Sequence, residues 1–528
     1  MAGPIDSAAL ERAAQLLIER HGSLRAGFEH ANLSRPVQVI AAGVRPPWRE
    51  FDLTSLDAAQ REARLIEFLA QDRVARFDLT TPPLLRFALM RLGEEEHRLV
   101  LTSHHLLIDG WSAAILVQEL LALYASGGNA AVLPVARPYR DYLAWVAAQD
   151  HAGAMSAWRE ALAGLQEPTR VAPHEGSDAR TPPEQMMLAL SAALSATLNE
   201  QARRAGLTLN TIIQTGWAIL LGRLLGRDDV VFGVTVAGRP PELTGTERMV
   251  GLFINTLPLR VKLAPDKPLL TLLREVQDSQ SKLMAHQHVG LAEIQSAAGL
   301  GELFDTLVVF ENYPLDGGNY RAAEEDGLRL VGATGHDATH YPLGLMALPG
   351  DQLRLRLDYR PDLYNRAAVE ALAERFVRLI AAAVAAPDAA VGRLDLLSAA
   401  ERETILRGWN DTAHGVPETT LPALFAAQAA KTPDATAVVF EQETLSYGEL
   451  NLRANRLAHH LRGLGVGPET VVGLCLARSP EMIVGLLGIL KAGGAYLPLD
   501  PDYPQERLAF MLADARARVL LTHAVTPG

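Results

Sequence analysis

Hydrophobic and polar positions follow two alternating patterns along most of this chain. Short apolar runs bounded by turn residues predict buried strands, and apolar positions three or four residues apart predict helices. The main predicted helices are 7–20, capped by Asp6 or Ser7, then 58–77, capped by Asp57, and 113–125, 194–204, 209–225, 269–286 and 366–386. The main predicted strands are 84–92, 97–102, 230–236, 303–314 and 353–359. Strands that alternate with helices predict a mixed sheet covered by helices.

One polar segment lies between a predicted strand and a predicted helix. It is the stretch 103–112, Ser-His-His-Leu-Leu-Ile-Asp-Gly-Trp-Ser. Such a junction is a usual place for chemistry, because a rigid scaffold positions the side chains. Strand alternation predicts that His104 and His105 face opposite ways, so that one reaches a substrate and the other packs. Asp109 can orient the turn, and Gly110 indicates a tight turn or a close backbone approach. A purely structural histidine pair is the alternative interpretation.

Composition and charge narrow the class of protein. The chain has 528 residues with 48% hydrophobic and 21% charged residues, which suggests two to four domains. The net charge of −12 argues against a nucleic-acid-binding surface. The only cysteine is Cys475, so an internal disulfide is excluded. We find neither a leader peptide nor an uncharged apolar run long enough for a membrane span, so the expected location is the cytoplasm.

The segment 103–112 resembles the active-site motif of the condensation domains of nonribosomal peptide synthetases, within the chloramphenicol-acetyltransferase-like acyltransferases. The resemblance implies that His105 is the catalytic histidine and that Asp109 is mainly structural, held by an arginine. The order Asp-Gly-Trp-Ser, with Trp111 as structural support, is that of condensation rather than epimerisation domains. The stretch 20–28 resembles the second block of the family, which implies that Arg25 is the partner of Asp109. A planar, bidentate arginine–carboxylate pair is well suited to locking a turn.

A later stretch, 250–260, is similar to the fifth block of the family. The resemblance places Asn255 and Thr256 near the substrate channel. Asn255 is a candidate contact to the substrate amide or carbonyl, and a loop residue that satisfies backbone groups is the equal alternative. His286 and His288 fall in the sixth block and are expected to be structural, because neither has a carboxylate at a fixed short spacing.

The resemblance changes near the end of the chain. The stretches 444–450 and 490–501 resemble the first two core blocks of amino-acid adenylation domains. The phosphate-binding loop of that family would follow 518–522, and it is not in this sequence; nor is there a Gly-x-x-x-x-Gly-Lys loop elsewhere. Without those backbone donors and that lysine, we expect no adenylation activity. At the other end, the first block of the condensation family is absent, so we expect an N-terminally truncated lobe.

The resemblance therefore implies an α/β fold with two chloramphenicol-acetyltransferase-like lobes in a V shape around a central channel, plus a truncated α/β piece of an adenylation domain. The expected domains are an N-terminal lobe, a C-terminal lobe entered by a crossing at 164–183, a linker and the N-terminal piece of an adenylation domain. Their expected bounds are 1–165, 166–395, 396–422 and 423–528.

The implied reaction is peptide-bond formation. The amine of an acceptor aminoacyl thioester attacks the thioester carbonyl of an upstream donor. Both substrates are tethered by 4'-phosphopantetheine to partner carrier proteins, so we expect no cofactor bound by this chain itself. A neutral His105 can take the amine proton or position the amine. The oxyanion can be met by the backbone N–H of Gly110 or Trp111, or by a protonated His105. The remaining expected partner is the rest of the adenylation domain, with neither nucleic acid nor membrane.

Three alternatives stay open at this level. A metal site would use two histidines and an aspartate, but adjacent strand histidines converge poorly on one ion and no fourth ligand stands out. A related acyl transfer to a soluble amine or alcohol is disfavoured by the attached adenylation start. The runner-up is a non-catalytic docking or scaffold module of the same assembly line, which turnover with two loaded carriers would distinguish from an enzyme.

Overall fold

The computed structural model describes residues 1–31, 33–172, 181–311, 328–337 and 339–523. They form two compact units, Met1–Leu406 and Arg407–Gly528. The border between the units lies inside the predicted linker. Parts of two predictions, 173–180 of the crossing and 312–314 of a strand, lie outside the described residues.

The first part of unit 1, here called the N-terminal lobe, is built on a three-stranded sheet of order β3-β4-β5. β4 is parallel to β3 and antiparallel to β5. Helices α1 and α3 pack together, and Leu10, Leu17 and Phe87 belong to their shared core. Asp6 caps α1 as predicted, because its carboxylate accepts the Ala9 N–H at 3.0 Å. The elements are α1 (Ser7–Arg20), β1 (Ala26–Glu29), β2 (Val37–Ile40), β3 (Trp48–Asp52), α2 (Ala58–Val74), β4 (Leu85–Arg91), β5 (His97–Ser103), α3 (Gly110–Ala125) and α4 (Tyr139–Ala147).

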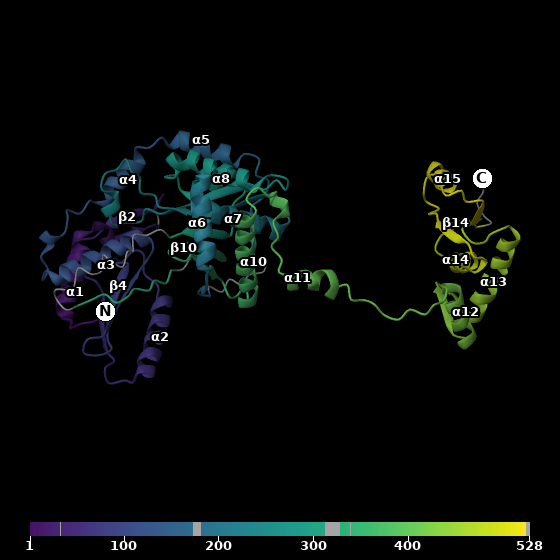
Figure 1. The fold of residues 1–528 in the computed structure, drawn as a ribbon, viewed down its shortest axis with the longest axis horizontal. Helices are drawn as coiled ribbons and strands as arrows, with labels where there is room; N and C mark the ends of the chain where they lie inside the picture. The colour runs from purple at the N-terminus through teal and green to yellow at the C-terminus, as the bar shows by residue number, and fades with distance from the viewer. Residues whose placement is uncertain (32, 173–180, 312–327, 338, 524–528) are drawn as a thin grey trace. The chain divides into compact units, whose positions relative to one another are not determined.

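The second part of unit 1, here called the C-terminal lobe, is built on a six-stranded mixed sheet of order β6-β11-β10-β9-β7-β8. Figure 1 shows α6, α7 and α10 gathered beside β10. Trp217 of α7 and Phe376 of α10 meet edge to face in this core, with ring centroids 5.9 Å apart. The elements are α5 (His151–Leu162), β6 (Glu184–Ala189), α6 (Ala192–Ala205), α7 (Leu209–Leu225), β7 (Asp229–Val236), β8 (Asn255–Lys262), α8 (Leu269–Leu283), α9 (Leu291–Ala298), β9 (Thr306–Phe310), β10 (Leu343–Leu348), β11 (Arg354–Tyr359), α10 (Arg366–Ala385) and α11 (Ala399–Glu403).

The chain enters the C-terminal lobe earlier than the sequence suggests. Trp158 and Leu162 of α5 belong to the core of the C-terminal lobe, and the Trp158 indole N–H donates to the His286 carbonyl at 2.9 Å. The predicted lobe border at residue 165 therefore follows a helix that already packs in the second core.

The first residues of the chain contact both lobes. The backbone N–H of Ala2 donates to the Arg329 carbonyl at 2.8 Å, and the Arg329 N–H donates back at 2.7 Å. Ala2 also forms a bridge to Glu96, and Gly3 donates to the Glu95 carbonyl at 2.8 Å. This short strip therefore joins the N-terminal lobe to the segment that precedes β10.

Unit 2 is a smaller α/β body. Its central sheet has the order β15-β14-β16 and is parallel, and β12 and β13 form a separate antiparallel pair. Helix α13 begins with a capping box of Ser446 and Glu449. The elements are α12 (Leu421–Lys431), β12 (Thr436–Phe440), β13 (Glu443–Ser446), α13 (Tyr447–Gly463), β14 (Val471–Cys475), α14 (Pro480–Ala492), β15 (Ala495–Pro498), α15 (Gln505–Asp514) and β16 (Val519–Thr522). Among the described helices of both units, none has the length and apolar character that a membrane crossing needs.

Candidate active site

The two histidines lie in the turn between β5 and α3. β5 ends at Ser103, so strand alternation no longer applies to them. The His104 N–H donates to the Leu84 carbonyl at 2.8 Å, and the His104 carbonyl accepts the Leu107 N–H at 3.0 Å. Leu107 and Ile108 are buried in and beside the core. The backbone of the turn is therefore fixed from both sides, and the two imidazoles have different surroundings.

The His104 ring supports the turn. Its Nδ1 accepts the backbone N–H of Leu106 at 3.1 Å, and the ring meets Phe77 edge to face at 6.3 Å. Burial lowers the pKa of His104, and the neighbouring His105 adds to the effect. An Nδ1 that accepts a hydrogen bond carries no proton, so the geometry and the direction of the pKa shift agree on a neutral ring. This contact pattern is the packing role expected for one of the two histidines.

The His105 ring is accessible. Its side chain is 43% exposed, and its Nε2 lies 3.6 Å from a carboxylate oxygen of Asp337, in the segment that precedes β10. The hydrogen bond with Asp337 raises the pKa of His105, while burial acts in the opposite direction. Of the two imidazoles, His105 is thus the one that solvent reaches and that the C-terminal lobe contacts. Sequence analysis did not identify Asp337.

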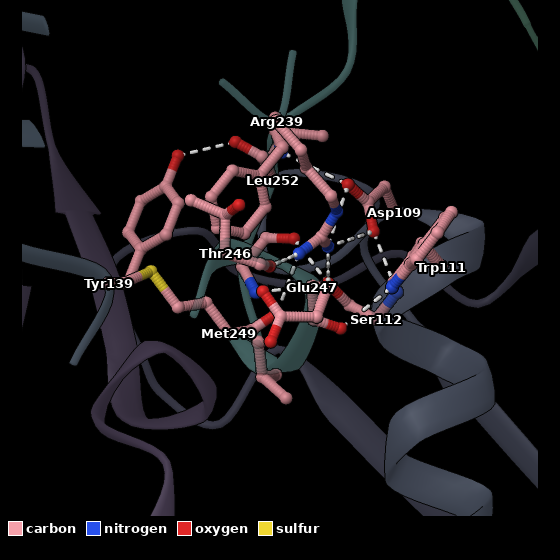
Figure 2. Close-up of polar contacts among 12 residues, drawn as sticks. Asp109, Trp111, Ser112, Tyr139, Arg239, Thr246, Glu247, Met249 and Leu252 are labelled. Carbon is pink, nitrogen blue, oxygen red and sulfur yellow. Dashed lines mark hydrogen bonds and ion pairs between the residues drawn. The ribbon is translucent and has the colours of Figure 1, made fainter. Parts of the chain in front are cut away.

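Asp109 holds the start of α3. Its side chain is fully buried. Its carboxylate accepts the Ser112 N–H at 2.7 Å as the helix cap and the Phe253 N–H at 3.1 Å from the loop before β8. The Arg239 guanidinium donates to both carboxylate oxygens, at 3.2 and 3.4 Å. Asp109 is therefore structural, with its oxygens engaged by the helix, the loop and one arginine (Figure 2).

The predicted partner of Asp109, Arg25, is wrong. Arg25 ends the 3₁₀ turn Gly22–Arg25, and its guanidinium donates to the Ala41 carbonyl at 2.8 Å. The physical reason lies in the loop 237–254 between β7 and β8, which places Arg239 against the N-terminus of α3. Arg25 supports the chain after β2 instead.

The loop 237–254 is folded around the Arg239 guanidinium. The guanidinium donates to the Met249 carbonyl at 3.0 Å and to the Thr246 carbonyl. It also lies 3.9 Å from the Phe253 ring centroid, a cation–π contact. Gly238, just before it, has φ +61°, and a Cβ there would come within 1.8 Å of the Phe253 carbonyl oxygen. Only glycine permits this close backbone approach.

Two neighbours of Asp109 complete the contact between the lobes. The Ser112 hydroxyl donates to the Gly251 carbonyl at 2.8 Å and accepts the Gly251 N–H at 3.1 Å. The Trp111 indole N–H donates to the Glu247 carbonyl at 2.9 Å. Figure 2 shows these side chains arranged around the Arg239 guanidinium. Gly110 is the first residue of α3, directly after the Asp109 cap. We call Asp109, Ser112, Arg239 and the backbone they bind the interlobe clamp.

The Asn255 side chain is used structurally. Its amide nitrogen donates to the Gln287 carbonyl at 2.9 Å and to the Val289 carbonyl at 2.7 Å. Both amide hydrogens are therefore taken by backbone, which is the alternative that the sequence left open. Thr256 lies in β8 opposite Thr235 of β7, and its predicted place at the channel stays a prediction. Within the described ranges, no group of three His, Cys, Asp or Glu side chains is arranged to hold a metal ion.

Comparison with known families decides the classification. The family model of the condensation domain matches residues 1–406, more than half of the chain. The chain belongs to the condensation-domain family. A partial AMP-binding domain follows, since the AMP-binding enzyme model matches residues 425–527.

Relatives of known name cover nearly all of this condensation-domain chain. Bacitracin synthase 3 of Bacillus licheniformis is 36% identical over 528 residues, which are 99% of this chain and 8% of that protein. Surfactin synthase subunit 3 of Bacillus subtilis (strain 168) is 36% identical over 524 residues, which are 99% of this chain and 41% of that protein. The chain thus spans less than half the length of these relatives.

A solved structure agrees on the fold. The AMPPNP-bound form of the nonribosomal peptide synthetase FmoA3 is similar, with a TM-score of 0.76 and 26% sequence identity. The match covers 99% of this chain and 55% of that chain. The mixed α/β class predicted from the sequence is confirmed.

Proposed function

We propose that this chain forms an amide bond between two thioester-bound substrates. The amine of an acceptor aminoacyl group attacks the carbonyl of an upstream peptidyl or aminoacyl donor. The carrying observation is the accessible His105 imidazole, held on a fixed turn four residues before Asp109 of the interlobe clamp. The family membership of the chain supports the reaction class.

The chemistry needs little activation of the carbonyl, because a thioester is already reactive. The C–N bond forms, the C–S bond breaks, and the thiol leaves with a proton. His105 removes the amine proton or positions the amine, and a backbone N–H at the start of α3, from Gly110 or Trp111, is the candidate donor to the oxyanion. Holding the two reactants together supplies much of the rate.

The substrates are proposed to arrive on donor and acceptor carrier proteins, each with a 4'-phosphopantetheine arm. In this proposal the chain contributes the reaction centre and the carriers contribute the cofactor. The assignment also keeps His104 in the turn as support, since its Nδ1 already accepts the Leu106 N–H.

The test uses two carrier proteins loaded with aminoacyl-pantetheine thioesters, drawn from a panel of amino acids. Dipeptidyl thioester on the acceptor carrier is measured by mass spectrometry. His105→Ala should abolish product while leaving the unfolding curve unchanged. His30→Ala, which alters an exposed histidine of the same lobe, should keep full activity.

Two outcomes would contradict the proposal. Full product from His105→Ala would remove the catalytic assignment of His105. Carrier binding by the wild-type chain without product for any pair in the panel would favour the docking module over the enzyme.

A further inference from the structure

The contact between His105 and Asp337 joins the two lobes at the reaction centre. His105 belongs to the N-terminal lobe, and Asp337 belongs to the segment of the C-terminal lobe before β10. The Asp337 side chain is 49% exposed, and its carboxylate is 3.6 Å from the His105 Nε2. A solvent-accessible carboxylate therefore stands beside the ring nitrogen that faces away from the chain's own turn.

The surroundings of Asp337 are acidic. Arg356 of β11 pairs with Asp358 at 3.0 Å and with Glu311 at 3.6 Å. Burial raises the pKa of Glu311, and it raises the pKa of Asp358 to about 6; the charge of Asp337 adds to both shifts. The Arg356 guanidinium thus lies among several carboxylates on this side of the site. From its own lobe, His105 also feels the charge of Asp109 and lies beside His104.

We propose that Asp337 is a positioning residue for the reaction: its carboxylate holds the His105 ring from the opposite lobe and provides the anionic seat for the ammonium group of the acceptor. The second half of this proposal rests on the proposed function. An α-amino group has an ordinary pKa of about 7.7–8.0, so most acceptor enters as a cation at neutral pH. The cation replaces the His105 ring as the partner of Asp337.

The proton balance of the step is simple. The ammonium N–H bond breaks, the proton goes to the His105 Nε2, and the lone pair stays on nitrogen. The amine then forms the C–N bond as the C–S bond breaks, and the second amine proton goes to the departing sulfur. The imidazolium finally returns its proton to water. Asp337 keeps its charge throughout and holds first the ring and then the amine.

The direct test is a titration of His105 by NMR in the full chain labelled on histidine, without substrates. Because Asp337 raises the pKa of His105, Asp337→Asn should lower the titration midpoint. Asp337→Glu should restore at least part of the shift. Asp351→Asn is the matched control, since it removes an exposed carboxylate from the turn between β10 and β11 and should leave the midpoint unchanged. A midpoint that does not move in Asp337→Asn, or that moves equally in Asp351→Asn, overturns the pair.

The seat for the acceptor is tested by comparing two soluble acceptors, glycyl-pantetheine and aminooxyacetyl-pantetheine. The first carries an ammonium group at neutral pH, and the second carries a nitrogen nucleophile of similar shape that is uncharged. Asp337→Asn should raise KM several-fold for glycyl-pantetheine and leave KM for aminooxyacetyl-pantetheine nearly unchanged. The acid limb of the pH–rate profile should also move to lower pH.

The two tests separate the claims. Equal effects on both acceptors would overturn the ammonium seat. Absence of product from the wild-type chain would overturn the proposed function and the seat with it, whereas the NMR shift in Asp337→Asn would still establish that Asp337 holds the His105 ring.

Discussion

Arg239 donates to the Asp109 carboxylate at 3.2 Å across 130 residues of sequence. Both side chains are almost fully buried, 0% exposed for Asp109 and 6% for Arg239. A buried ion pair gives little net stability over an apolar pair, but losing one partner is costly because a buried charge is left unpaired. The pair therefore fixes where the turn of His105 lies relative to the loop 237–254.

Arg239→Ala should destabilise unit 1 by about 3–5 kcal/mol, since it leaves the Asp109 carboxylate buried without its counter-charge. Urea denaturation of the full chain followed by tryptophan fluorescence measures this loss. Five of the six tryptophans lie in unit 1, and the sixth, Trp409, is 72% exposed. Arg25→Ala is the control and should cost only about 1 kcal/mol, the value of one hydrogen bond to a carbonyl. Equal losses in the two variants would contradict the assignment of Arg239.

Ser112→Ala should destabilise unit 1 by about 2–3 kcal/mol, because it leaves both the N–H and the carbonyl of Gly251 buried without their partner. The same denaturation experiment measures it. Ser126→Ala, at the other end of α3, removes a weaker contact at 3.2 Å in a half-buried place and should cost under about 1 kcal/mol. A loss for Ser112→Ala no greater than that of the control would show that Gly251 finds other partners.

Asp358 should make the stability of unit 1 depend on pH. Its folded-state pKa is raised to about 6 by burial, so the folded state binds this proton more tightly than the unfolded state. Stability must then fall as pH rises from the ordinary value of the carboxyl toward 6, and level off above it. Asp358→Asn removes that fall. Between pH 4.5 and 7.5 the stability of Asp358→Asn relative to wild type should rise by about 2 kcal/mol, from 1.36 kcal/mol per pKa unit.

Urea midpoints at the two pH values, compared between wild type and variant, isolate this one group. The comparison is needed because groups such as Asp72 and Glu119, whose pKa values are lowered, give the opposite slope. A stability difference between the two proteins that stays constant from pH 4.5 to 7.5 would contradict the burial of an ionised Asp358.

The elements with strong local signals were predictable from the sequence. Helix α7 has the predicted bounds, because the Thr208 cap and Gly226 in the left-handed region mark its ends. Helix α2 ends at Val74 and not at Phe77, because the Phe77 ring packs under the Arg86 guanidinium, 4.4 Å away. A side chain whose partner lies on a distant strand gives no local sign of where its helix ends.

The same distinction applies to the site. His105 and Asp109 are recognisable because they share one short segment with a specific spacing. Arg239 and Asp337 are not, because each reaches the site from a loop far along the chain. The loop 237–254 offered one signal, an arginine between Gly238 and two prolines, but it also holds Arg248, and no periodicity distinguishes the two. Asn255 was ambiguous because the carbonyls that it binds lie beyond α8.

The strip at Ala2 gives the lobes a second seam beyond the interlobe clamp. Its paired hydrogen bonds with Arg329 lie in the described segment 328–337, the one that carries Asp337 toward His105. Any breathing motion that parts the lobes would have to unzip this seam or shear the clamp. The spacing between the imidazole and its acidic neighbour is thus buttressed from outside, so edits to the first few residues would be felt at the reaction centre without touching it.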